Sequence, residues 1–243
     1  MDLGLKDKHV VVTGGSSGIG SEIVKAFALE GAKVWFCGRS QLRIDRAYGY
    51  LNNLKAQVHG QSVDVNDLDN FSKWINLIPS IDIFIPNVSA LSDKWSDVLQ
   101  TDIWATQQCI DLVLPKLVQS PIAALTYIGS KASSTTVNNA NAYGAGKAAL
   151  AHYMKSLSLT YAPGLRVNTV SPGDTFIKNG LWGKCKNDNP KLFQQVLDRN
   201  PMGRLANPDE IAKVVTFISS PAASFVSGAN WYVDGASTNN IQY

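Results

Sequence analysis

The stretch HVVVTGGSSGIGSEIVKAFALEG, residues 9–31, decides the fold class of this chain. Its first five residues predict a short buried β-strand, which leads through a glycine-rich turn into a helix. Gly14, Gly18 and Gly20 permit a tight turn and a close approach to the backbone, and the first amides of the helix point outward. This order of elements is typical of a binding site for a pyrophosphate group.

The helix in this stretch has one apolar stripe and a clear end. Apolar side chains recur at helical spacing at Ile19, Ile23, Ala26 and Phe27, and Gly31 follows as a stop. The glycines follow the spacing GxxxGxG rather than the GxGxxG of the general dinucleotide fingerprint. An ordinary glycine-rich loop is therefore the alternative interpretation.

The rest of the chain alternates short apolar runs with amphipathic segments. The predicted strands lie near residues 8–13, 32–37, 57–63, 81–86, 122–129, 164–170 and 229–233. Such alternation predicts an α/β fold with a Rossmann-like, doubly wound parallel sheet of about seven strands and helices on both faces. We expect a single domain over residues 1–243. The longest irregular stretch is 171–189, and we expect a substrate lid within residues 171–200.

Composition and charge exclude several functions. With 45% hydrophobic and 17% charged residues among 243, the chain can bury the core of one soluble domain. A net charge of +3 without a Lys/Arg run predicts binding neither to nucleic acid nor to a membrane. Three cysteines without a CxxC pair, and three scattered histidines, predict no disulfide framework and no metal site. We see no signal sequence or membrane-spanning run and expect a cytoplasmic protein.

Tyr143, Lys147 and Ser130 form the pattern that predicts chemistry. Tyr143 and Lys147 lie four residues apart on one helix face, so the ammonium favours the phenolate. Ser130 lies upstream, after a predicted strand, and the three groups together can polarise and protonate a carbonyl. A solvated Tyr–Lys pair and a plain turn serine are the alternatives. The glycine-rich turn at the other end of the chain favours an enzyme.

With both ends considered together, the chain resembles the classical short-chain dehydrogenases/reductases over nearly its whole length. The family pattern TGxxxGIG, then Ser, then YxxxK stands at residues 13–20, at Ser130 and at Tyr143 with Lys147. Further matches are Asp64 with Val65, Asn87, Pro172 with Gly173, and VSGANWYVDGA at residues 226–236. The resemblance implies the strand order 3-2-1-4-5-6-7, a ligand crevice at the carboxyl ends, and a homotetramer or homodimer that uses helices near residues 92–118 and 141–162.

The resemblance also implies the reaction. Hydride passes between a nicotinamide and a carbonyl or secondary alcohol, with Tyr143 as acid/base, Ser130 polarising the carbonyl and Lys147 lowering the pKa of the tyrosine. We expect a reductase, such as a 3-oxoacyl or other ketone reductase. The implied cofactor-binding residues are Gly14, Ser16, Ser17, Gly18, Ile19, Gly20, Gly38, Arg39, Asp64, Val65, Asn87, Val88, Tyr143, Lys147, Pro172, Gly173 and Thr175.

The end of the second predicted strand, AKVWFCGRS at residues 32–40, indicates which nicotinamide cofactor is used. An NAD enzyme places an acid here against the ribose hydroxyl, whereas this chain has Gly38 followed by Arg39. A guanidinium can bind a 2′-phosphate through two hydrogen bonds. We predict NADP rather than NAD, and the alternative is an arginine that merely ends a strand in solvent.

Two positions depart from the family pattern. Asp102 stands where the helix lining the site usually carries a catalytic asparagine, and PNVS at residues 86–89 replaces the usual NNAG. We hypothesise that Asp102 is a catalytic proton relay, and the competing hypothesis is a partly disabled site. The alternative function is then a nucleotide-binding regulatory protein with weak or lost catalysis. Candidate pocket or contact residues are Ala132, Val137, Phe176, Trp182, Trp95 and Trp104.

Overall fold

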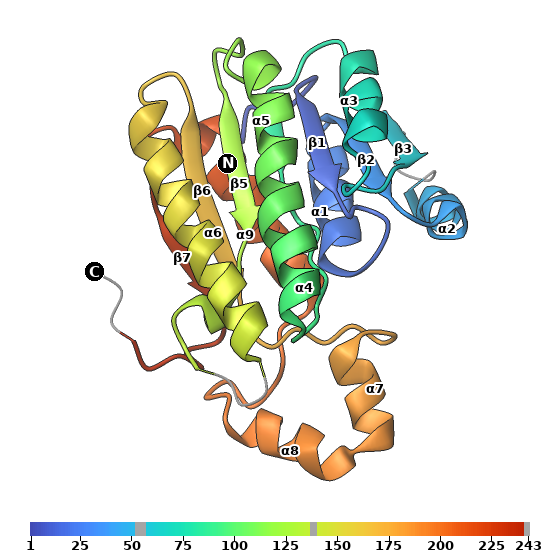
Figure 1. Cartoon of the computed structure of the whole chain (residues 1–243), viewed down its shortest axis with the longest axis vertical. Helices are drawn as coiled ribbons and strands as arrows, with labels where there is room; N and C mark the ends of the chain where they lie inside the picture. Colours follow the sequence, from blue (N-terminus) through green and yellow to red (C-terminus); the bar gives the residue numbers. More distant parts are fainter. Residues whose placement is uncertain (52–56, 137–139, 241–243) are drawn as a thin grey trace.

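A parallel sheet with the strand order β3-β2-β1-β4-β5-β6-β7 forms the centre of the molecule (Figure 1). The structure is a computed structural model that describes residues 1–51, 57–136 and 140–240. The strands are β1 (His9–Thr13), β2 (Lys33–Gly38), β3 (Val58–Ser62), β4 (Ile83–Ile85), β5 (Ala124–Ile128), β6 (Arg166–Pro172) and β7 (Asn230–Val233). Seven predicted strands and their order are confirmed.

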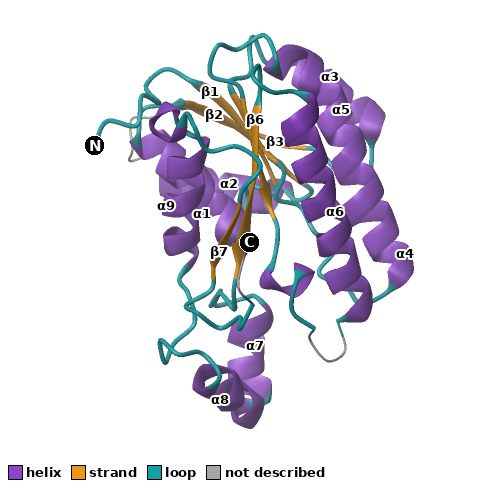
Figure 2. Ribbon diagram, turned by 90° about the vertical axis from the view of Figure 1, so that its left-hand side faces the viewer, coloured by secondary structure: helices purple, strands orange, loops and turns teal. Residues whose placement is uncertain are grey.

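Helices cover both faces of this sheet (Figure 2). Helices α3, α5 and α6 supply the core on one face, and α1, α2 and α9 supply it on the other. The helices are α1 (Gly18–Leu29), α2 (Gln41–Leu51), α3 (Leu68–Leu77), α4 (Trp95–Asp97), the π-helix η2 (Val98–Ala105), α5 (Thr106–Leu117), the short 3-10 turn η3 (Lys131–Ser133), α6 (Asn141–Thr160), α7 (Leu181–Asp188), α8 (Pro190–Asp198), α9 (Pro208–Ser219) and the 3-10 turn η4 (Pro221–Ala223). This is the single Rossmann-like domain that the alternation predicts.

The two cores follow from the alternation of side chains along each strand. Val11 of β1 packs with the α3, α5 and α6 face, while Val10 and Val12 pack with the α1 and α9 face. Burial of each such side chain contributes about 1.5–3 kcal/mol. The predicted stripe of α1 is confirmed: Ile23 and Phe27 are buried, and Ile19 and Ala26 are half-buried and pack against the same core.

The segment after β6 differs from the irregular stretch expected for residues 171–189. The strand continues to Pro172, and helices α7 and α8 follow. Figure 1 shows these two helices beyond the carboxyl ends of the strands, apart from the rest of the molecule. Among the described helices, none combines the length and apolar character that crossing a bilayer requires.

Candidate active site

The glycine turn after β1 has a backbone that other residues would strain. Gly14 and Gly18 have φ values of +66° and +59°, in the left-handed region. A Cβ on Gly20 would lie 2.2 Å from the carbonyl oxygen of Gly14, so no side chain fits there. Helix α1 begins after Ser17, whose side chain makes no capping hydrogen bond, and Ile19 lies half-buried in its first turn. Uncapped helix amides beside a glycine-rich turn fit a pyrophosphate.

Neighbouring loops brace this turn. The side-chain nitrogen of Asn87, after β4, donates to the carbonyl oxygens of Thr13 and Gly14 at 3.1 and 3.3 Å. Ser16 lies against the end of β2, because a Cβ on Gly38 would be 2.5 Å from its Oγ. The resemblance assigns Asn87 to the ribose region, whereas here its amide donor is already committed to holding the turn in shape.

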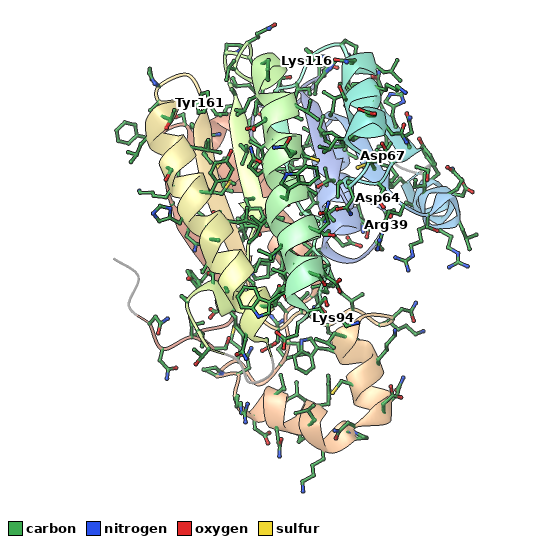
Figure 3. All side chains as sticks on the ribbon, viewed as in Figure 1. Arg39, Asp64, Asp67, Lys94, Lys116 and Tyr161 are labelled. Carbon is green, nitrogen blue, oxygen red and sulfur yellow. The ribbon has the colours of Figure 1, made fainter. Side chains whose placement is uncertain are left out.

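Arg39 and Asp64 follow the adjacent strands β2 and β3 and lie close together (Figure 3). The amide of Val63 donates to the carbonyl oxygen of Gly38 at 3.1 Å, which joins the two strand ends. Arg39 is exposed, and within the described parts of the chain its guanidinium has no ion-pair partner. Asp64 is half-buried and Val65 is buried. An unpaired guanidinium at this edge fits a phosphate better than a ribose hydroxyl.

Ser130, Tyr143 and Lys147 come together at the carboxyl end of β5. Ser130 follows that strand, and its side chain lies close enough to the phenol of Tyr143 on α6 to lower the pKa of that phenol. Lys147 lies one turn further along α6 and is buried, with its Nζ 5.7 Å from the ring centroid of Tyr143. This Nζ donates to Tyr127 Oη and to the carbonyl oxygen of Ile128, both at 3.0 Å. The fold thus assembles the predicted group, whose catalytic roles stay a prediction.

Burial dominates the titration of this group. It lowers the pKa of Lys147 to about 8, although the nearby Asp102 acts to raise it. Burial also raises the pKa of Tyr143; the hydrogen bond with Ser130 lowers it, and the charges of Asp102 and Asp174 raise it further. The balance for Tyr143 is upward in the protein alone, so a pKa lowered by Lys147 stays a prediction for the working enzyme.

Asp102 connects the two departures from the family pattern. It lies on η2 and is only 1% exposed. Its Oδ2 accepts the backbone amide of Ala90, directly after the PNVS segment, at 3.0 Å. Its Oδ1 is buried and has no hydrogen-bond partner among the described residues. Val88 of the same segment packs on the glycine turn, 3.1 Å from the Cβ that Gly14 lacks. Sequence reasoning missed the contact because it joins a loop to a helix through space.

The segment after β6 returns to the glycine turn. Pro172 ends the strand, and the hydroxyl of the buried Thr175 donates to the carbonyl oxygen of Gly173 at 3.1 Å. Further along, Ile177 Cδ1 lies 3.0 Å from the Cβ that Gly18 lacks. The predicted cofactor-binding residues Pro172, Gly173 and Thr175 therefore lie on the segment that also approaches the predicted pyrophosphate site.

An ion pair lies next to the Ser130–Tyr143–Lys147 group. Lys131, next to Ser130, pairs with Asp174, and its Nζ also donates to Ser237 Oγ at 3.0 Å. The side chains of Lys131 and Asp174 are only 16% and 21% exposed. Asp174 is also close enough for its charge to act on Tyr143. Neither residue was singled out from the sequence, since a lysine and an aspartate far apart in the chain carry no local signal.

The other candidate pocket residues are dispersed. Phe176 packs edge-on against Phe193, with their ring centroids 6.1 Å apart, and Trp182 is half-buried on α7. Val137 lies outside the described residues, and Ala132 donates its backbone amide to Ser130 Oγ at 3.1 Å. Trp95 and Trp104 are 55% and 44% exposed, so they are not core residues.

Tyr127 is the site residue that sequence reasoning missed. It lies on β5, is 1% exposed and binds the ammonium of Lys147. The available signal was a phenol in the short strand ALTYI, which ends two residues before Ser130.

Comparisons with known proteins agree with this geometry. Residues 14–238 match a family model described as enoyl-(acyl carrier protein) reductase. The isoepoxydon dehydrogenase of Penicillium expansum is 33% identical over 96% of this chain and 95% of its own. The galactitol 2-dehydrogenase (L-tagatose-forming) of Cereibacter sphaeroides is 32% identical over 93% of each chain.

A solved structure extends the likeness to three dimensions. L-Sorbose reductase from Gluconobacter frateurii, complexed with NADPH and L-sorbose, is 26% identical with a TM-score of 0.90, over 99% of this chain and 100% of that one. Sequence matches across almost the whole chain agree with the glycine turn and the Ser–Tyr–Lys group. This chain therefore belongs to the classical short-chain dehydrogenase/reductase family of oxidoreductases.

Proposed function

We propose that this protein is an NADP-dependent carbonyl reductase whose chemistry is carried by Tyr143, Ser130 and Lys147. The observation that carries the proposal is that the side chain of Ser130 and the buried ammonium of Lys147 both lie beside the phenol of Tyr143. A bound nicotinamide would supply the hydride. Tyr143 gives its phenolic proton to the carbonyl oxygen, and Ser130 donates a hydrogen bond to that same oxygen. Because burial raises the pKa of Tyr143, the phenol keeps its proton at neutral pH, which favours reduction.

The same proposal assigns the cofactor site. The turn from Gly14 to Gly20, with Ser16 and Ser17, holds the pyrophosphate; Asp64 and Val65 border the adenine, and Lys147 binds the nicotinamide ribose. Pro172, Gly173 and Thr175 border the carboxamide. Arg39 binds the 2′-phosphate, so Arg39→Ala weakens NADPH binding about tenfold or more and leaves NADH binding within about twofold. Fluorescence titration with both cofactors checks this, and equal losses for the two would remove the assignment.

The substrate we favour is a small ketone with hydroxyl groups next to the carbonyl. The Lys131–Asp174 pair offers a cation and an acceptor beside Tyr143, which suits hydroxyl groups. The named relatives include a galactitol dehydrogenase and an L-sorbose reductase. The other class is a 3-oxoacyl thioester, as expected from the sequence. A panel with L-sorbose, unsubstituted cyclohexanone and acetoacetyl thioesters separates the two classes by kcat/KM.

Two further roles belong to this proposal. We assign residues 171–200, with α7 and α8, to a lid over the substrate, supported by the contact of Ile177 with the glycine turn. We assign Asp102 to a proton relay, supported by its burial and its unpaired Oδ1. A homotetramer in the cytoplasm completes the proposal, supported by exposed apolar side chains on η2, α5 and α6 at Leu99, Trp104, Leu112 and Leu159.

Replacement of the phenol tests the proposed function. Tyr143→Phe keeps the ring and removes the proton donor, so turnover falls by about a hundredfold or more while NADPH binding persists. Loss of absorbance by NADPH across the ketone panel measures the rate. If the variant turns over as fast as the wild-type protein, the mechanism is wrong. If the wild-type protein binds NADPH but reduces nothing in the panel, the regulatory alternative holds.

A further inference from the structure

The ammonium of Lys147 is held by two fixed acceptors on one strand. Its three N–H donors have Tyr127 Oη and the carbonyl oxygen of Ile128 as partners, each at 3.0 Å. Both acceptors belong to β5, and Nζ also lies 4.9 Å from the ring centroid of Tyr127. One donor is left over, and the ring centroid of Tyr143, one helical turn earlier on α6, lies 5.7 Å from Nζ.

Tyr127 is suited to this task because it stays an uncharged acceptor. Burial raises its pKa well above the usual value, and the charge of Asp102 raises it further. The charged and titratable groups around Lys147 come from three elements: Tyr127 on β5, Tyr143 on α6 and Asp102 on η2. Around Tyr143, Ser130 and Asp174 add to these. Of these groups, Tyr127 has its hydroxyl bonded directly to the ammonium.

We propose that Tyr127 is a positioning residue, which through its hydroxyl fixes the ammonium of Lys147 so that the free N–H faces Tyr143 and the bound cofactor. The inference rests on the proposed reductase function. A hydrogen bond to a charged form favours that form, so the hydroxyl also keeps Lys147 protonated in a buried place. Without it, Lys147 loses its proton at a lower pH and its direction is set by Ile128 alone.

Tyr127→Phe tests the proposal, since it removes only the hydroxyl and keeps the ring under the ammonium. We expect kcat to fall about tenfold or more with the KM for the ketone within about twofold. We also expect the alkaline limb of the pH profile of kcat to move to lower pH. The matched control is Tyr153→Phe on α6, the helix of Lys147; the Tyr153 hydroxyl donates to Asp111 at 3.5 Å, and this variant should behave as wild type.

A second measurement needs no turnover. In protein labelled with 15N-lysine, the Nζ signal of Lys147, assigned with Lys147→Met, should titrate at lower pH in Tyr127→Phe than in wild type. A thermal melt establishes that the variant is folded. A wild-type titration midpoint overturns the proposal, as does a fall in kcat without any shift in the pH profile, which would mean a merely structural role. If wild type shows no turnover, the reductase proposal fails and the NMR titration alone decides the role of Tyr127.

Discussion

At the scale of single residues, the central feature is that burial disfavours the charged form of Lys147. Its side chain is buried, and burial outweighs the attraction of Asp102. The ammonium persists at neutral pH through two hydrogen bonds and a nearby carboxylate. Because the pKa of Lys147 lies near neutral pH, neighbouring charges change the fraction of this side chain that is protonated.

The lowered pKa of Lys147 predicts how the stability of the folded protein depends on pH. The pKa of Lys147 is about 8 when folded and 10.5 when exposed, so between these values the unfolded chain binds more protons. The penalty of burying the ammonium is therefore complete below pH 8 and is relieved as the pH rises to 10.5. Relative to Lys147→Met, the free energy of unfolding of wild type should increase by up to about 1.4 kcal/mol per pH unit in this window. Urea unfolding of both proteins at pH 7.5, 9 and 10 measures the difference, and a constant difference would contradict it.

Asp102→Asn isolates the carboxylate. An amide oxygen can still accept from Ala90, which preserves the loop, but the charge that raises the pKa values of both Lys147 and Tyr143 is gone. We expect the alkaline limb of the kcat profile to move to lower pH and kcat to fall several-fold. A profile identical to wild type would leave no part for a titrating relay.

At the scale of elements, the junction of the glycine turn with α1 depends on a close contact between the backbone of Gly20 and that of Gly14. Gly20→Ala would place a Cβ 2.2 Å from the carbonyl oxygen of Gly14, which forces the turn open. We expect a loss of about 2 kcal/mol or more in stability and a loss of NADPH binding. Gly49→Ala is the matched control, because its Cβ would meet nothing within 4 Å in α2 and should stabilise the helix slightly. Chemical unfolding with NADPH titration compares them, and equal behaviour of the two variants would contradict the argument.

The strands of the sheet could be predicted from the sequence, whereas helix α7, which does not pack on the core, could not. The strands of the sheet were located within two residues, and β1, β4 and β5 in particular are short, buried runs. The edge strands β3 and β7 are not buried, and their prediction rests on the alternation of strands with helices. Helix α7, which lies within the stretch expected to be irregular, was missed because it stands off the core: among its residues only Gly183 is buried. Ser130, Tyr143 and Lys147 follow from spacing on adjoining elements. The bonds from Asp102 to Ala90 and from Lys131 to Asp174 join segments that only the folded chain brings together.

At the scale of the whole molecule, apolar side chains exposed on η2, α5 and α6 predict self-association. Trp104 is 44% exposed and Leu99 51%, on the helices expected to form a subunit interface. Trp104→Asp should convert the assembly to smaller species, measured by size-exclusion chromatography with light scattering. Leu29→Asp on α1, 61% exposed on the opposite face of the sheet, is the control and should leave the mass unchanged. A wild-type protein that elutes as a monomer would remove the prediction.

The position of Ile177 over Gly18 bears on the timing of catalysis. We expect a nucleotide that binds at the glycine turn to displace this side chain, which belongs to the segment leading into α7 and α8. We therefore expect the nucleotide to bind before the ketone substrate. Initial-rate kinetics should then show a compulsory-order pattern, in which the ketone binds only after the dinucleotide has displaced the segment that carries Ile177.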